Sequence, residues 1–316
     1  MAQNSCFSDG YGAQEHAREA VTHVAKIIRN FMKNSESSIC LLDGMCFNIY
    51  DQIDDTNKLT IVRDIRSNRL RMSSIYLKPP QVINSNSVDT SKWIVDKETP
   101  VLNSYSTTMI EELFLSGAAT MDRYASAKVL ILGLGGGYMN THLHHNFPKM
   151  DITVIEIEPQ MLEISRKWFG LTLDERQRVI IKDGVHFLEN AVAEGHKYDA
   201  ILVDACVTDV NEWIICPCES FVKHEMVENY AKLLSERGAF IVNVLSVRYT
   251  SKSVGRELRN MFSAAFKNCI IKQSHSETNT VMTCTQQPRP RDLDRQYEVF
   301  AEYKKYGGRV SELIDA

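Results

Sequence analysis

The sequence lacks the features that would place the protein in a membrane or on nucleic acid. No segment reaches the roughly 18 consecutive apolar residues of a membrane-spanning helix. The first six residues, Met-Ala-Gln-Asn-Ser-Cys, do not begin the charged-then-apolar pattern of a secretory signal. The formal net charge is only −4, too small for a basic field that would attract nucleic acid. We therefore expect a cytoplasmic protein whose partners include neither a membrane nor a nucleic acid.

Cysteine is present, but not in a pattern that holds a metal. The eight cysteines are Cys6, Cys40, Cys46, Cys206, Cys216, Cys218, Cys269 and Cys284. Only Cys216 and Cys218 lie close in sequence, and no second pair follows at the spacing of zinc ligands. We expect no metal site, and in a reducing compartment we expect free thiols.

The chain is long enough for one large domain and an accessory one. Its 316 residues are 44% hydrophobic and 24% charged, which is ordinary for a globular protein with a full core. Apolar residues recur at helical spacing in 14–32, and short β-type runs in 38–77 flank a turn at Ser67 and Asn68. We predict an N-terminal helix (1–37), a small antiparallel β unit (38–100), a main domain (101–290) and a helical tail (291–316).

Strands and helices alternate through the main domain. We expect strands at 129–132, 152–156, 178–182, 198–203 and 239–245, and helices at 106–120, 138–146, 160–168, 185–194 and 219–235. Alternation of this kind indicates parallel strands joined by helical crossovers. The strands at 269–273 and 279–284 are too close for such a crossover, so the last strand should run antiparallel. The fold class is therefore α/β, with a mostly parallel Rossmann-like sheet whose last strand is antiparallel.

A glycine-rich turn follows the first strand of this sheet. The apolar run 129–132 leads into Gly133, Gly135, Gly136 and Gly137, and a helix follows. Glycine is needed where the backbone approaches a ligand closely or where φ is positive. The alternative is that packing alone requires this turn. A ligand site is therefore indicated only if the other strand ends also carry suitable residues.

Each of the next three strands ends in a carboxylate. Glu156 follows the glycine turn at the spacing where an acidic side chain accepts both hydroxyls of a ribose, and Glu158 is the alternative for that role. Asp183, followed by Gly184, ends the third strand, where it could accept from an adenine amino group, and Asp204 ends the fourth. Helix capping explains one such residue but not all of them. The pattern predicts a ribose-bearing cofactor at the carboxyl edge of the sheet.

NAD is the competing cofactor. The dinucleotide fingerprint has a glycine where this chain has Tyr138. It also predicts a second mononucleotide-binding half, whereas the last third of this chain carries the short antiparallel return. We therefore favour a cofactor with a single nucleoside over NAD.

In this region the chain resembles the spermidine synthase-like class I methyltransferases. The resemblance spans 105–285 and includes the phrases Leu132-Gly-Leu-Gly-Gly-Gly, Val154-Ile-Glu-Ile-Glu-Pro, Lys167-Trp-Phe-Gly and Cys216-Pro-Cys-Glu-Ser-Phe-Val. It implies S-adenosylmethionine (AdoMet) as cofactor, with Glu156 on the ribose, Asp183 on the adenine and the 133–137 turn around the methionine part. It also implies methyl transfer to an amine of a protein N-terminus or a lysine, and a small β unit that covers the active site.

The chain departs from true spermidine synthases at the residues that those enzymes use for polyamines. They share the fold but use decarboxylated AdoMet, whose amine is held by an aspartate in the glycine turn, where this chain has Gly136. Their Tyr-Gln pair and their paired aspartates correspond here to Ser106-Thr107 and to the segment from Asp204 to Asp209. An aminopropyltransferase in polyamine synthesis and a non-catalytic AdoMet-fold binding protein remain the alternatives.

Two aspartates are candidates for handling the acceptor amine. Asp204 could orient an ammonium and let its proton escape, and Asp209 is a second candidate. Loop structure is the alternative explanation for Asp204. Tyr105 and Trp213 could wall the acceptor pocket, although aromatic residues more often lie in a core or at a rim. The expected partner is an amine-bearing substrate, and a protein substrate and a homodimer are left open.

Overall fold

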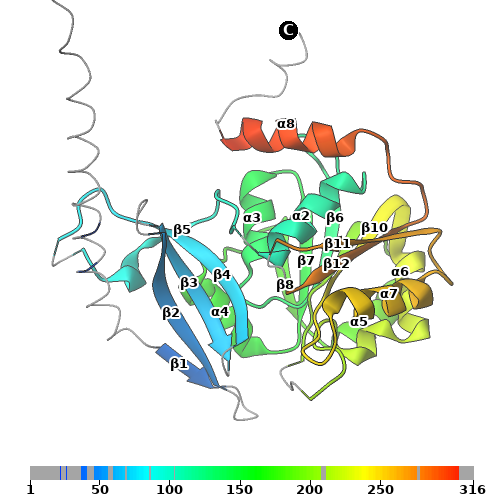
Figure 1. Cartoon of the computed structure of the whole chain (residues 1–316), viewed down its shortest axis with the longest axis horizontal. Helices are drawn as coiled ribbons and strands as arrows, with labels where there is room; N and C mark the ends of the chain where they lie inside the picture. The colour runs from blue at the N-terminus through cyan, green and yellow to red at the C-terminus, as the bar shows by residue number, and fades with distance from the viewer. Residues whose placement is uncertain are drawn as a thin grey trace, which may run out of the picture. The chain divides into compact units, whose positions relative to one another are not determined.

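The computed structural model of the protein divides into two compact units (Figure 1). The first comprises the chain up to Thr99 together with Trp168–Gly170, and the second comprises the rest of the chain from Pro100. Apart from Thr22 and Lys26, the N-terminal helix expected at 14–32 lies outside the described residues. The structure describes residues 37–40, 46–55, 60–67, 70–84, 87–102, 104–207, 211–275 and 278–305, with Thr22 and Lys26 alone before them.

The first unit is an antiparallel sheet in the order β1-β2-β3-β4-β5. Its elements are β1 (Ser37–Cys40), β2 (Cys46–Asp55), β3 (Thr60–Ser67), β4 (Leu70–Lys78), the 3-10 helix η1 (Thr90–Lys92) and β5 (Ile94–Asp96). Ile61, Leu77, Val88 and Trp93 form a cluster of buried residues in it. On β3, the buried Arg63 donates from Nε and Nη2 to the two carboxylate oxygens of Asp51, at 2.7 and 2.6 Å. The antiparallel strands expected in this region are confirmed.

The second unit is built on a seven-stranded sheet in the order β11-β12-β10-β9-β6-β7-β8. Its strands are β6 (Lys128–Leu132), β7 (Asp151–Glu156), β8 (Gln177–Ile181), β9 (Tyr198–Val203), β10 (Leu234–Val244), β11 (Asn268–Gln273) and β12 (Thr280–Thr285). β6 to β10 pair in parallel, and β12 pairs antiparallel with both β10 and β11. The expected Rossmann-like sheet with a reversed last strand is therefore confirmed.

Helices pack on both faces of this sheet. They are α2 (Tyr105–Leu115), α3 (Tyr138–Asn146), α4 (Pro159–Trp168), α5 (Gly184–Ala193), the 3-10 helix η2 (Glu219–Val222), α6 (His224–Leu233), α7 (Ser251–Phe262) and α8 (Leu293–Lys305). Helices α5, α6 and α7 share a core with Phe240 and Met282 of the sheet. On the other face α2 contacts α3 and β12, and Figure 1 shows the red α8 beside α2, where Phe300 meets Phe114.

The structure corrects the expected helix boundaries. α2 ends at Leu115 rather than at 120, because Gly117 has a φ of 82° and takes the left-handed conformation that ends helices. The single helix expected at 219–235 is wrong. Extended backbone at Lys223 separates η2 from α6, and β10 begins already at Leu234.

Helix α7 was not expected from the sequence. Its buried residues Val254, Leu258 and Phe262 recur every four residues, which is a helical signal. Gly255 in the same segment weakens that signal, because glycine lowers helix propensity. A Cβ at Gly255 would lie 3.5 Å from Ile271 of β11, which is an ordinary van der Waals contact, so packing against β11 does not require glycine there.

The expectation of free thiols is wrong for most of the described cysteines. Cys206 is bonded to Cys216 and Cys269 to Cys284, and Cys46 is also disulfide-bonded. Strand pairing is the reason for the second bond, because its two cysteines are register partners on β11 and β12. Cys218 carries a free thiol.

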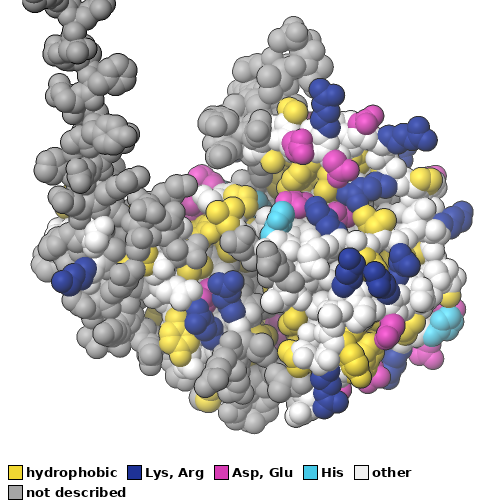
Figure 2. Space-filling view, viewed as in Figure 1, with side chains coloured by type: hydrophobic (Ala, Val, Ile, Leu, Met, Phe, Trp, Pro, Cys, Tyr) yellow, Lys and Arg dark blue, Asp and Glu magenta, His cyan; other side chains and the backbone are white. Residues whose placement is uncertain are grey.

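The surface carries charges of both signs. On the face shown in Figure 2, Lys and Arg side chains are interspersed with Asp, Glu and hydrophobic side chains. This mixture agrees with the small net charge of the sequence. Among the described residues, no helix has both the length and the apolar character needed to cross a bilayer.

Candidate functional site

The carboxyl ends of β9, β6, β7 and β8 lie side by side in the sheet. The glycine turn 133–137 follows β6, and Glu156 is the last residue of β7. Asp183 and Asp204 follow β8 and β9 within two residues of each strand end. The structure therefore brings the four features expected from the sequence to one edge.

The glycine turn needs glycine for two reasons. Gly133 has a φ of 94°, and a Cβ there would lie 2.6 Å from the carbonyl oxygen of Asp204. Gly135 and Gly137 also have positive φ, of 52° and 73°, and Gly137 is the N-cap of α3. Gly136 lies buried between them. The turn thus brings the N-terminal N–H groups of α3 to the edge of the sheet, where helix N-termini favour anions.

Glu156 is bound to the glycine turn. Its Oε2 accepts from the backbone N–H of Leu134 at 2.8 Å, and its Oε1 accepts from that of Glu158 at 2.9 Å. The residue is only 8% exposed, and burial raises the pKa of its carboxyl, although these N–H groups act in the opposite direction. Each carboxylate oxygen has two lone pairs, so both oxygens retain capacity for another donor.

Asp183 is the N-cap of α5. Its Oδ1 accepts from the backbone N–H groups of Val185 and His186, at 2.8 and 3.1 Å. Capping therefore engages one oxygen of this carboxylate, and Oδ2 takes no part in the cap. Gly184 has a packing reason to be glycine, because a Cβ there would lie 2.7 Å from the ring of Phe221.

Asp204 is held by side chains from two other elements. Its Oδ2 accepts from the hydroxyl of Tyr105 on α2 at 3.0 Å, and its Oδ1 accepts from Nδ2 of Asn243 on β10 at 2.8 Å. Burial raises the pKa of Asp204 to about 7, although the hydrogen bonds from Asn243 and Tyr105 lower it. Near pH 7 this carboxylate can therefore take up or release a proton at little cost.

The remaining candidates from the sequence fare differently. Asp209 lies outside the described residues. Trp213 is half-buried and packs against the core of the second unit, whereas Tyr105 reaches Asp204. Sequence reasoning missed Asn243, although it is the only polar residue in the apolar run 239–245, which was a usable signal.

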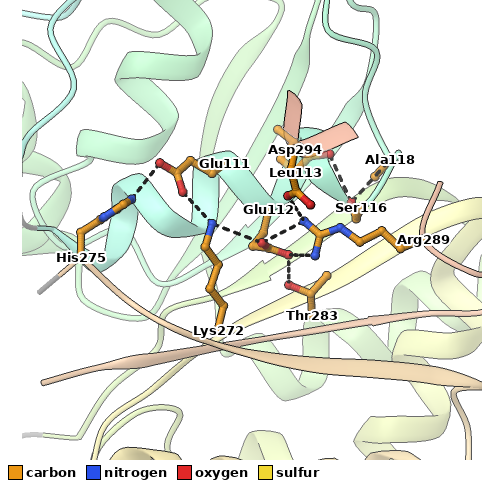
Figure 3. A network of polar contacts seen from close by, with 10 residues as sticks. All are labelled: Glu111, Glu112, Leu113, Ser116, Ala118, Lys272, His275, Thr283, Arg289 and Asp294. Carbon is orange, nitrogen blue, oxygen red and sulfur yellow. Dashed lines mark hydrogen bonds and ion pairs between the residues drawn. The ribbon is translucent and has the colours of Figure 1, made fainter. Parts of the chain in front are cut away.

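A network of ion pairs holds α2 on the β11–β12 hairpin (Figure 3). The buried carboxylate of Glu112 lies 3.2 Å from Nη2 of Arg289 and accepts from the hydroxyl of Thr283 at 2.9 Å. Glu111 pairs with Nζ of Lys272 at 2.9 Å and with Nε2 of His275 at 2.8 Å. Because α2 begins with Tyr105, this network also fixes the donor to Asp204.

The reversed last strand and the glycine turn with carboxylates at the neighbouring strand ends define a Rossmann-like domain of the class I methyltransferase type. Residues 108–289 match the spermine/spermidine synthase domain, and the chain belongs to that family.

Curated relatives include methyltransferases and an aminopropyltransferase. The eEF1A lysine and N-terminal methyltransferase homolog of Drosophila melanogaster is 29% identical over 188 residues, which are 60% of this chain and 26% of that protein. The human eEF1A lysine and N-terminal methyltransferase is 30% identical over 164 residues, which are 51% of this chain and 23% of that protein. The polyamine aminopropyltransferase of Vibrio vulnificus is 28% identical over 174 residues, which are 55% of this chain and 56% of that protein. The chain thus spans about a quarter of the length of these methyltransferases.

Two solved structures are similar in fold. Human methyltransferase-like protein 13 in complex with SAH has a TM-score of 0.55 at 22% identity, covering 64% of this chain and 90% of that one. A probable spermidine synthase from Corynebacterium glutamicum has a TM-score of 0.60 at 13% identity, covering 86% and 87%. At these identities the likeness establishes the fold.

Proposed function

We propose that this protein is an AdoMet-dependent methyltransferase that acts on an amine of a protein, with an N-terminal α-amine preferred to a lysine. The observation that carries the proposal is the state of Asp204, a half-buried carboxylate with a pKa of about 7 beside the glycine turn. The relatives named as eEF1A lysine and N-terminal methyltransferases support it.

The edge of the sheet suits the chemistry of AdoMet. Glu156 offers a carboxylate that could accept from both ribose hydroxyls. Beside it, Ile157 and Ile181 are 61% and 40% exposed, and such apolar side chains could cover the faces of an adenine. Asp183 has an oxygen outside its helix cap for the adenine amino group. The N–H groups at the start of α3 suit the methionine carboxylate.

Gly136 favours AdoMet over its decarboxylated form. The resemblance to spermidine synthases places their amine-binding aspartate at this position, where the present chain has a buried glycine. Glycine adds no negative charge near the carboxylate that AdoMet carries. The family also contains aminopropyltransferases, and the Vibrio relative bears that name, so aminopropyl transfer is the second candidate.

The pKa of Asp204 supports an α-amine over a lysine as the acceptor. An α-amine has a pKa near 8 and a lysine near 10.4, so freeing the lone pair near pH 7.2 costs about 1 kcal/mol for the first and about 4 kcal/mol for the second. A base with a pKa of about 7 can take a proton from the first amine with little loss. An N-terminal amine therefore fits this site better than a lysine.

The residues of the chain would act on the acceptor as follows. Asp204 receives the proton of the ammonium, and Tyr105 and Asn243 hold the carboxylate in one orientation while it does so. The free nitrogen lone pair must then lie in line with the methyl group. AdoMet supplies that methyl on a cationic sulfur, so that the N–C bond forms as the S–C bond breaks and its electron pair stays on sulfur.

The test incubates the full chain with methyl-tritiated AdoMet and recombinant eEF1A. The N-terminus of the eEF1A is either free or acetylated. We expect label on the free form, and mass spectrometry should place the methyl on the α-amine. Label that is equal on both forms would move the acceptor to lysine. A parallel reaction with decarboxylated AdoMet and putrescine should give no spermidine, and turnover there with none on eEF1A would favour the aminopropyl candidate.

A further inference from the structure

Two buried asparagines connect Asp204 to the loop between β11 and β12. Nδ2 of Asn243 donates to Oδ1 of Asp204 at 2.8 Å, and Nδ2 of Asn279 donates to Oδ1 of Asn243 at 2.8 Å. The hydroxyl of Thr278 in turn donates to Oδ1 of Asn279 at 2.8 Å. Asn243 is fully buried and Asn279 is 4% exposed. Amides buried to this degree are costly unless they are hydrogen-bonded, and the oxygen and nitrogen of both amides have hydrogen-bond partners here.

Chemistry fixes the direction of these hydrogen bonds. An ionised carboxylate only accepts, so Asn243 must turn its NH2 group toward Asp204. Its amide oxygen then faces position 279, where a donor is required. Asn279 provides that donor, and its own oxygen accepts from Thr278. This series of hydrogen bonds therefore holds the Asn243 amide in one of its two orientations.

Asn279, at the outer end of this series of hydrogen bonds, is itself held in place. The backbone oxygen of Asn279 accepts from the backbone N–H and the hydroxyl of Ser274, at 3.1 and 2.7 Å, and from Nε2 of Gln273 at 2.9 Å. These residues belong to the β11–β12 segment that the ion pairs of Glu111 tie to α2 (Figure 3). Tyr105 and Asn243, which donate to the two oxygens of Asp204, are thus both held by contacts to the β11–β12 segment.

Building on the proposed function, we propose that Asn243 is a positioning residue for Asp204, and that Asn279 acts one step further out by orienting the Asn243 amide. Asn243 keeps the carboxylate turned toward the acceptor amine. It also favours the ionised form, the form that can receive a proton.

Few titratable groups face Asp204 in the part of the chain that the structure describes. Tyr105 faces it from α2, and Asn243 from β10 is not titratable. In its own loop, Sγ of Cys206 lies 3.8 Å from Oδ1, but this sulfur is disulfide-bonded and does not titrate. The pH response of the site should therefore report mainly on Asp204.

The experiment titrates Asp204 directly by NMR of protein labelled with 13C at the aspartate carboxyl carbon. The signal missing from Asp204→Asn identifies the residue, and we expect it to titrate near pH 7. In Asn243→Leu the midpoint should move up by about one pH unit, because a hydrogen bond to the charged form is lost. Asn279→Leu removes the donor that orients the Asn243 amide but keeps Asn243 itself, so the midpoint should move up by less. The acid limb of the kcat/KM profile on eEF1A should move equally, with about a fivefold loss at pH 7 for Asn243→Leu.

Tyr230→Phe is the control. It removes the buried hydrogen bond from the Tyr230 hydroxyl to the backbone oxygen of Phe221, which involves neither the asparagines nor α2, so stability should fall while the Asp204 midpoint stays in place. If both asparagine variants leave the midpoint unchanged, the inference is overturned. If Asn243→Leu does not fold, Asn279→Leu decides alone. Because the NMR titration needs no acceptor, a shifted midpoint without methyl transfer would refute the proposed function and leave the role of Asn243 standing.

Discussion

The hydroxyl of Tyr105 donates to Oδ2 of Asp204 at 3.0 Å, although 99 residues separate the two in sequence. Tyr105 is the first residue of α2, after the N-cap Ser104, and Asp204 follows β9. Packing of α2 against β10 and β12, reinforced by Glu112, brings them together. The proposed acceptor site therefore depends on how α2 is held on the sheet.

Tyr105→Phe should raise the pKa of Asp204 further, because the phenol stabilises the ionised carboxylate. We expect kcat/KM at pH 7 to fall about three- to tenfold and to recover toward pH 9, since one hydrogen bond to a charged group is lost. AdoMet affinity, measured by calorimetry, should not change. Tyr124→Phe, at an exposed site, is the control. An unchanged acid limb in Tyr105→Phe would remove this contact from the mechanism.

Asp204→Asn should stabilise the protein at pH 8 relative to the unmodified chain, and the gain should disappear toward pH 4. The folded pKa of about 7 lies above the unfolded value near 3.9, so the folded state binds more protons between these values. The contribution of Asp204 to stability is therefore complete below pH 4 and is lost as the pH rises through 7. Urea midpoints at pH 5 and pH 8 measure the difference, and turnover should fall at least tenfold. A stability difference that is independent of pH would contradict the raised pKa.

Gly133→Ala should damage the site far more than Gly195→Ala, although both glycines have positive φ. A Cβ at 133 would lie 2.6 Å from the backbone oxygen of Asp204, whereas a Cβ at 195 would meet nothing within 4 Å. We expect Gly195→Ala to cost about 1 kcal/mol of unfolding free energy and to spare AdoMet binding. Gly133→Ala should cost about 3 kcal/mol or more and abolish binding. Equal losses in urea denaturation would show that close approach is not the reason for Gly133.

Glu156→Gln should weaken AdoMet binding about 10- to 100-fold, because the ribose hydroxyls lose a charged acceptor. Glu158→Gln is the matched control, since only the backbone N–H of Glu158 bonds to Glu156. Calorimetry with AdoMet measures both variants, with circular dichroism to confirm folding. A larger loss in Glu158→Gln would transfer the ribose role to that residue.

Gly136→Asp should weaken AdoMet binding and spare or improve binding of decarboxylated AdoMet. An aspartate there would oppose the carboxylate of AdoMet, with a repulsion on the order of 4 kcal/mol at about 4 Å and an effective dielectric of 20, before screening. The same charge would attract the amine that the decarboxylated form presents. Gly136→Asn adds a similar side chain without charge and controls for size. If the aspartate and asparagine variants lose both ligands alike, charge at position 136 does not select the cofactor.

Much of the fold could be read from the chain because its signals are local. Apolar runs separated by helical segments predict parallel strands, and the short gap between β11 and β12 predicts the reversed last strand. The glycine turn and the carboxylates Glu156, Asp183 and Asp204 were predicted to share an edge, because successive parallel strands end on the same side of a sheet. Helix boundaries were predicted wrongly where the backbone conformation of one residue sets them, as at Gly117 and Lys223.

The sequence by itself determined the class of fold and the residues that meet at its carboxyl edge, since strand order and residue type are enough for both. Only the tertiary structure decided which side chains control Asp204. Tyr105, Asn243 and Asn279 come from separate segments, and local sequence does not encode which distant residues will touch. The same holds for the Cys206–Cys216 bond. The pKa of about 7 at Asp204 likewise follows from burial, which an aspartate acquires only once the chain has folded around it.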